Sequence, residues 1–111
     1  MAKKSKMPAG EVLDLAGLVN YARESIVSRT LLENKAGTVT LFAFDAGQGL
    51  SEHTAPFDAL VQVLDGHGRF TVGGRPSTVR TGQVLLMPAN VPHAVQAGQR
   101  FKMLLTMLRA K

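Results

Sequence analysis

The chain has 111 residues, of which 45% are hydrophobic and 19% are charged, and its formal net charge is +5. This length suits one domain with a single core, and the balance of apolar and charged residues excludes a disordered chain. The chain has no cysteine, which excludes disulfides and thiolate metal sites, and no apolar run reaches the ~18 residues of a membrane helix.

The basic residues do not follow a nucleic-acid-binding pattern. Three of them, Lys3, Lys4 and Lys6, lie near the N-terminus, and the others are scattered. Nucleic-acid-binding domains concentrate Lys and Arg on one face, often with aromatic residues between them, whereas only 5% of this chain is aromatic. We therefore expect neither a nucleic-acid nor a membrane partner. Because no apolar signal core follows Met1–Met7, we expect a cytoplasmic location.

The N-terminal part of the chain predicts a tail followed by short elements. Residues 1–10 are expected to form a flexible basic tail. Residues 11–15 indicate a short strand, and residues 16–22 indicate one or two turns of helix that must pack on another element. Residues 25–32 are rich in β-branched side chains and predict a strand.

The central part predicts a turn, a strand and then a pair of strands joined by a corner. Residues 33–37 have the composition of a turn, and residues 38–45 predict a strand with two largely apolar faces, as inside a sandwich. A glycine-rich loop then leads into a strand that ends at a histidine, followed by a proline corner and a further strand formed by an apolar run. This run ends at Asp65-Gly66, which supplies the positive φ that a tight turn needs.

The C-terminal part predicts a series of short strands, over residues 68–72, 77–80, 83–87 and 92–95. Gly73-Gly74 suits the hairpin between the first two, and Pro88 ends the third because proline cannot donate to a strand ladder. Residues 101–108 fit a helix or a strand by periodicity, and the need for a pairing partner favours a strand. Many short strands with regular turns predict an all-β sandwich or barrel.

The stretch from the glycine-rich loop to the Asp-Gly turn resembles the first signature motif of the cupin superfamily. In that motif a glycine is followed at fixed spacing by two histidines, a glutamate and a second glycine. Gly47, His53 and Gly66 stand at the first, second and last of these positions. Ala55 stands at the second histidine position and Ala59 at the glutamate position, so half of the metal ligands are replaced.

A second stretch resembles the second cupin motif. Gly82, Pro88 and His93 match its spacing, while Asn90 stands at its glycine position and Ala97 at its asparagine position. Asparagine is a sensible replacement because it adopts positive φ more readily than most residues.

The two motifs together indicate a small single-domain cupin with a degenerate metal-binding motif. The resemblance covers about residues 38–108. It implies an all-β double-stranded β-helix, or jelly-roll barrel, with a short N-terminal helical or arm segment. We assign residues 11–111 to this single domain. Many small cupins of this kind have no assigned activity.

The resemblance also implies where a site would lie. In cupins the motif side chains converge at one end of the barrel and hold a divalent metal such as Fe, Mn, Ni or Zn. Carried over by position, only His53 and His93 remain, since Ala55 and Ala59 offer no ligand atom. A catalytic zinc normally takes three protein ligands. The two histidines are therefore either ligands of a weakly bound metal or polar residues of a small-molecule pocket.

Nearby polar residues are not expected to complete the set. Glu52 and Asp58 each stand one position from a motif site, and Gln62 has the opposite parity to the glutamate position. On regular strands their side chains point to the other face, although a β-bulge near Pro56 would re-aim one of them. His67 lies in a glycine-flanked turn and is expected to be exposed, without a functional role.

These patterns leave three functional hypotheses. The first is a small cupin-barrel protein of unassigned activity that binds a small polar molecule near His53 and His93. The alternative is a metal-dependent cupin enzyme, of dioxygenase, decarboxylase or isomerase type, that uses the same two histidines. A metal-free isomerase would instead use a histidine as a general base. The third is an interaction role through the basic surface.

The chain is also expected to assemble. Small cupins are commonly dimers. Here the apolar segments 12–15 and 26–32 precede the motif-bearing barrel and exceed what that barrel needs to close. Pairing an exposed edge strand across a two-fold axis would remove an aggregation hazard and bury apolar area. We therefore predict a homodimer in which residues before Thr38 contribute to the interface.

Overall fold

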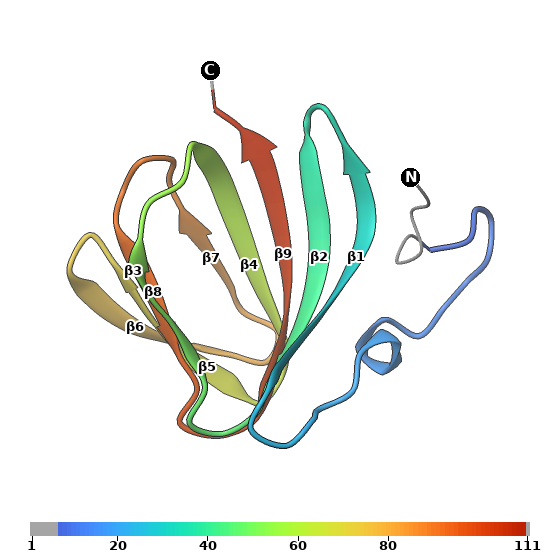
Figure 1. Ribbon diagram of the computed structural model, residues 1–111, viewed down its shortest axis with the longest axis horizontal. Coiled ribbons are helices and arrows are strands. Elements are labelled where there is room, and N and C mark those ends of the chain that lie inside the picture. Colours follow the sequence, from blue (N-terminus) through green and yellow to red (C-terminus); the bar gives the residue numbers. More distant parts are fainter. Residues whose placement is uncertain (1–6, 111) are drawn as a thin grey trace.

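In the computed structural model, which describes residues 7–110, the strands form two antiparallel sheets that face one another (Figure 1). The larger sheet contains, in spatial order, β1 (Ile26–Asn34), β2 (Gly37–Phe44), β9 (Phe101–Arg109), β4 (Phe57–Asp65) and β7 (Val84–Met87). The smaller sheet contains β3 (Gly49–His53), β8 (His93–Gln96), β5 (His67–Val72) and β6 (Arg75–Arg80). The predicted all-β jelly-roll barrel is confirmed.

The predicted strands from residue 25 onward are all present, with small shifts at their ends. The strand predicted over residues 11–15 is wrong, because this segment pairs with no strand and leads into the 3₁₀ helix η1 (Leu15–Leu18). The tail predicted over residues 1–10 lies mostly outside the described residues. Among residues 7–110, no helix is both long and apolar enough to cross a membrane.

The main core fills the space between the two sheets and closes one end of the barrel. Phe44 and Phe101 stack with ring centroids 4.6 Å apart, and Phe70 meets Phe101 edge-on at 6.0 Å. A Cβ at Gly68 would lie 2.7 Å from the Phe101 ring, so only glycine permits this packing. The closed end therefore lies at the start of β9, opposite the end where β3 stops and β8 begins.

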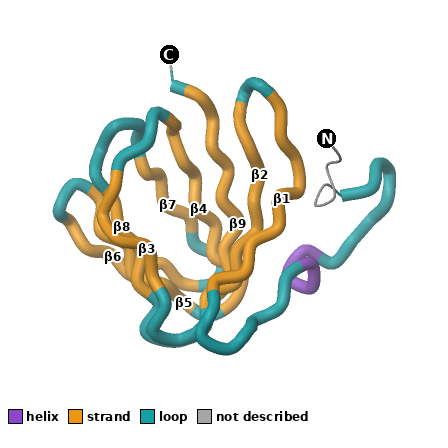
Figure 2. Tube along the Cα trace, viewed as in Figure 1, coloured by secondary structure: helices purple, strands orange, loops and turns teal. Residues whose placement is uncertain are grey.

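Residues 7–25, which we call the N-terminal strap, run along the outside of the larger sheet (Figure 2). A second apolar cluster joins the strap to the outer faces of β1 and β2, and its buried members are Val19, Leu31, Leu41 and Ala43. Two cations fix the strap by its backbone. Arg29 Nη1 donates to the carbonyl oxygen of Leu18 at 3.3 Å, and Lys102 Nζ donates to that of Ala16 at 2.6 Å.

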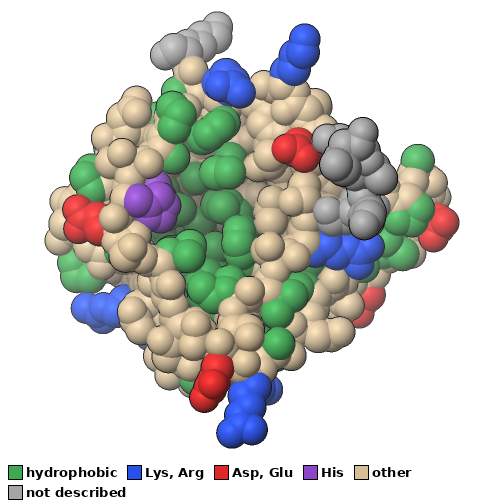
Figure 3. Space-filling model, viewed as in Figure 1, with side chains coloured by type: hydrophobic (Ala, Val, Ile, Leu, Met, Phe, Trp, Pro, Cys, Tyr) green, Lys and Arg blue, Asp and Glu red, His purple; other side chains and the backbone are tan. Residues whose placement is uncertain are grey.

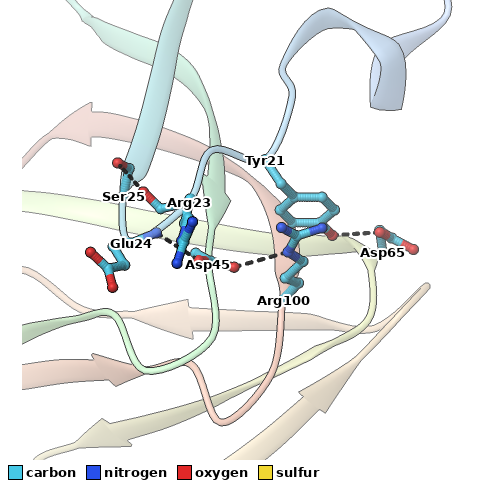
Figure 4. Close-up of polar contacts among 7 residues, drawn as sticks. All are labelled: Tyr21, Arg23, Glu24, Ser25, Asp45, Asp65 and Arg100. Atoms are coloured by element: carbon cyan, nitrogen blue, oxygen red, sulfur yellow. Dashed lines mark hydrogen bonds and ion pairs between the residues drawn. The ribbon is translucent and has the colours of Figure 1, made fainter.

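A polar network anchors the end of the strap (Figure 4). The Tyr21 hydroxyl donates to Asp65 Oδ2 at 2.5 Å, and the Arg100 guanidinium lies 5.1 Å from the Tyr21 ring centroid. Arg100 Nε donates to Asp45 Oδ1 at 2.9 Å, and the Glu24 amide donates to Asp45 Oδ2 at 2.7 Å. The hydrogen bond from Arg100, followed by that from Glu24, lowers the pKa of Asp45 to about 2. Burial, followed by the hydrogen bond to Asp65, raises the pKa of Tyr21 well above its ordinary value.

Candidate functional site

His53 and His93 lie side by side at the open end of the barrel. They are paired in register across β3 and β8. Their ring centroids are 4.3 Å apart in an edge-to-face arrangement. His93 is 8% exposed, whereas His53 is exposed. The structure thus brings together the two histidines that the sequence singled out.

A β-bulge in β3 turns His53 toward the barrel interior. Leu50 pairs with Val95 and His53 pairs with His93, so three steps along β3 match two along β8. Residues three apart on a regular strand point to opposite faces, and one extra residue restores them to the same face. Leu50 packs against the inner core. His53 therefore also faces inward, beside His93.

Each histidine is oriented by one backbone hydrogen bond. His53 Nδ1 lies 2.7 Å from the carbonyl oxygen of Ser51, and His93 Nδ1 lies 3.1 Å from that of Val91. Because a carbonyl oxygen can only accept, each Nδ1 carries the proton that it donates. In the neutral ring this leaves the lone pair on Nε2, as in histidines that bind metals or accept hydrogen bonds from ligands.

The two replaced motif positions carry no ligand atom and have structural neighbours instead. Ala59 is 4% exposed and pairs with Met87 on β7 and Met107 on β9. The carbonyl oxygen of Ala55 accepts a hydrogen bond from the backbone N–H of Asn90 at 2.8 Å. Asn90 has a φ of 66°, which agrees with its prediction as a substitute for the motif glycine. An apolar wall thus stands where the resemblance places a glutamate.

Other polar residues do not complete a metal site. Glu52 and Gln62 are exposed, and Asp58 Oδ1 accepts a hydrogen bond from the Ala89 amide at 2.9 Å. Within residues 7–110 there is no group of three or more His, Cys, Asp or Glu side chains that could hold a metal ion. The described side chains therefore do not fit the four-ligand divalent site that the cupin motifs imply.

His67 lies away from the histidine pair. It begins β5 near the closed end of the barrel, is exposed, and accepts a hydrogen bond at Nδ1 from Gln99 Nε2 at 3.2 Å. This placement agrees with its predicted exposure. His67 therefore serves as an internal comparison for the other two histidines.

A hollow opens between the two sheets, and hydrophobic side chains line it with a histidine at its edge (Figure 3). We call it the barrel hollow. Inward hydrophobic side chains that pack on the core but remain partly exposed are Ile26, Phe42, Leu50, Val72, Leu85, Leu105 and Met107. Thr38, paired with Met107, has a buried hydroxyl with no hydrogen-bond partner among the described residues. Sequence reasoning missed both the apolar wall and Thr38, since alternation alone does not show which inward residues stay partly exposed.

Other surface depressions lie away from the histidines. One of about 450 Å³ lies over β3, β8 and β5 beside Arg69. Two others, of about 550 and 560 Å³, lie beside the N-terminal strap and around Arg100. Neither histidine lines any of the three. The polar groups of the last are engaged with one another in the network that anchors the strap. We therefore place the candidate site at the barrel hollow.

A barrel of two antiparallel sheets with a histidine pair at its open end defines a class of small β-barrel proteins, and the sequence identifies the family within that class. The sequence model of the Cupin domain family matches residues 40–107. This match covers more than half of the chain, and the chain belongs to the cupin family. No curated protein sequence matches it.

Solved structures of similar proteins agree. A conserved protein of unknown function from Streptococcus pyogenes is 34% identical, with a TM-score of 0.90 over 96% of this chain and 93% of that one. A cupin 2 conserved barrel domain protein from Leptotrichia buccalis is 42% identical, with a TM-score of 0.85 over 87% of this chain and 47% of that one. A cupin superfamily protein from Desulfitobacterium hafniense is 27% identical, with a TM-score of 0.87 over 96% of each chain. These descriptions assign no specific activity.

Proposed function

We propose that this cupin domain binds a small polar molecule in the barrel hollow and that His53 and His93 orient it. One observation carries the proposal: both Nδ1 atoms are held by backbone carbonyls, so two Nε2 atoms remain for a ligand at the open end of the barrel. A concave, mostly apolar site with a few convergent polar groups is the usual form of a small-molecule site.

The side chains that line the hollow further define which chemical groups a ligand should have. A neutral Nε2 accepts a hydrogen bond, so the ligand presents a hydroxyl or amine group to the histidines. The partly exposed hydrophobic side chains favour an apolar carbon skeleton. Ala55 and Ala59 add no polar group to the walls where the motif has a histidine and a glutamate.

A library screen tests this proposal. Small polar molecules are screened for binding by ligand-observed NMR, first with the wild-type protein and then with His53→Ala/His93→Ala. We expect hits that bind the wild type and His67→Ala but lose binding to the double variant. A screen in which every hit binds the double variant as well as the wild type would overturn the proposal.

A metal-dependent enzyme is the alternative proposal. The paired Nε2 atoms are suitable ligands for one ion, which is the observation in its favour. The thioethers of Met87 and Met107 beside Ala59 are poor ligands for Fe, Mn, Ni or Zn in their divalent states. We therefore expect substoichiometric metal in the purified protein by elemental analysis. Stoichiometric metal would support the enzyme proposal instead, with the two histidines as metal ligands.

We further propose a homodimer to which residues before Thr38 contribute. β1 lies at an edge of the larger sheet, and Leu32 on it is 55% exposed. The outer faces of β9, β4 and β7 also carry exposed apolar side chains, namely Leu60, Val84, Leu86 and Leu108. A cytoplasmic location stays a proposal as well, which cell fractionation tests.

A further inference from the structure

Arg75 stands in the same row of side chains as the two histidines. Across the smaller sheet, His53 pairs with His93, His93 with Val72, and Val72 with Arg75. Residues directly opposite each other on antiparallel strands point to the same face. Val72 packs against the inner core, so this is the inner face. We propose that Arg75 is a third binding residue of the barrel hollow and that it takes the carboxylate of a small hydroxy acid.

The Arg75 guanidinium is exposed and available. Within residues 7–110 no hydrogen bond or ion pair engages it, whereas Arg29 and Arg100 are both engaged in holding the strap and its anchor. Arg69 and Arg80 also have free guanidinium groups among the described contacts, but their partners in the ladder place them on the outer face. Arg75 differs from Arg69 and Arg80 because it lies on the inner face of the sheet, not because it is more exposed.

The spacing suits a small molecule with two polar groups. Neighbouring strands lie about 4.7–4.9 Å apart, so the backbones of Arg75 and His93, two strands apart, are separated by about 10 Å. One small ligand could contact both a long arginine side chain and an imidazole across this span. No acidic side chain belongs to the row, and Asp58 is occupied on the outer face by the Ala89 amide. The row therefore offers a fixed positive charge next to two hydrogen-bond acceptors.

These groups define the class of ligand. A guanidinium donates only, and it binds a carboxylate through charge-assisted hydrogen bonds. The Nε2 lone pairs of His53 and His93 accept from a hydroxyl. The hydrophobic walls contact the carbon skeleton, and they disfavour a phosphate dianion, which is costlier to remove from water. A small hydroxy acid with an apolar body can contact the guanidinium, the Nε2 lone pairs and the hydrophobic walls at once. This inference rests on the proposed small-molecule function.

Calorimetric titration with three related probes tests the inference. Mandelate carries the carboxylate, the hydroxyl and an apolar ring, mandelamide lacks the charge, and phenylacetate lacks the hydroxyl. We expect the wild type to bind mandelate about tenfold more tightly than mandelamide and several-fold more tightly than phenylacetate. Arg75→Gln should remove the preference over mandelamide while keeping the preference over phenylacetate.

Arg69→Gln is the matched control, because it removes the same charge from the outer face of the same sheet. It should keep both preferences. The inference is overturned if the wild type binds none of the three probes, or binds mandelamide as tightly as mandelate. It is also overturned if Arg69→Gln loses as much affinity as Arg75→Gln, since the effect would then be one of net charge. Failure of the proposed small-molecule function would be seen separately, in a library screen in which every hit binds the double histidine variant as well as the wild type.

Discussion

At the scale of single residues, the neighbours of the histidine pair determine which ring nitrogens are free to bind a ligand. Backbone carbonyls of Ser51 and Val91 fix which nitrogen of each ring carries a proton. Ala55 and Ala59 remove two side chains that would have competed for the same space. The result is a pair of acceptors that no third His, Cys, Asp or Glu of residues 7–110 joins as a metal ligand, which favours ligand orientation over tight metal binding.

Removing both histidines should leave the fold intact. His53 is exposed, and His93 lies at the rim rather than in the aromatic core. His53→Ala/His93→Ala is expected to reduce the free energy of unfolding by about 1–2 kcal/mol, the usual range for a substitution that leaves no buried charge. Urea denaturation measures this change. A loss of cooperative unfolding would mean that the pair is structural.

Restoring the two missing motif ligands should create a metal site. Ala55→His/Ala59→Glu completes the four-ligand set, and the flexible side chains of Met87 and Met107 can yield space to the new glutamate. The buried carboxylate should destabilise the metal-free protein, and Ni²⁺ should restore its stability. Titration with Ni²⁺ and Mn²⁺ measures the affinity. No gain over the wild type would show that the motif register is wrong at these positions.

At the scale of elements, the strands were predictable from the sequence, whereas two local features were not. Branched apolar runs between glycine and proline turns predict strands because pairing and burial both favour them there. The β-bulge in β3 was not predicted, because neither Ser51 nor Glu52 is of a residue type that marks an extra position in a strand ladder. Residues 11–15 were predicted as a strand from their mix of apolar and acidic residues, but they pair with no strand: Leu15 packs on the face of the larger sheet, whereas Val12 is fully exposed.

The network that anchors the strap predicts a specific response to acid. The pKa of Asp45 is lowered to about 2 from 3.8, so this carboxylate stabilises the fold above pH 3.8. That contribution is lost as the pH falls from 3.8 to about 2, because over this range the unfolded chain takes up a proton that the folded protein does not. The stability difference between wild type and Asp45→Asn should therefore shrink between these pH values in denaturation profiles. A difference that stays constant over this window would contradict the anchoring role of Asp45.

At the scale of the whole molecule, the two ends of the barrel differ in how their inward side chains are packed. Stacked aromatic rings close one end, and the other end keeps inward side chains partly exposed around the histidine row. The motif spacings predicted that His53 and His93 lie together at one end of the barrel. They did not predict Arg75 as part of the site, because that residue reaches the row only through the pairing of three strands.

Light scattering tests the predicted assembly. The wild type should behave as a dimer, with twice the chain mass of 11.9 kDa, at micromolar concentration. Leu32→Glu, on the exposed part of the edge strand β1, should weaken the dimer by placing a charge in the interface. Thr78→Glu, on the edge strand β6 of the other sheet, should not. A monodisperse wild-type monomer would refute the homodimer, and a dimeric Leu32→Glu would exclude this part of β1 from the interface.

Nitrogen-15 NMR of the imidazole rings tests the binding role of the His53–His93 pair most directly. At a pH where all three histidines are neutral, the spectrum should show a proton on Nδ1 of both His53 and His93, as their carbonyl contacts require. Titration with mandelate should shift the Nε2 resonances of these two rings and leave His67, which is bonded to Gln99, unchanged. A shift confined to His67, or saturation of the protein with no shift in either paired ring, would contradict the binding site proposed here.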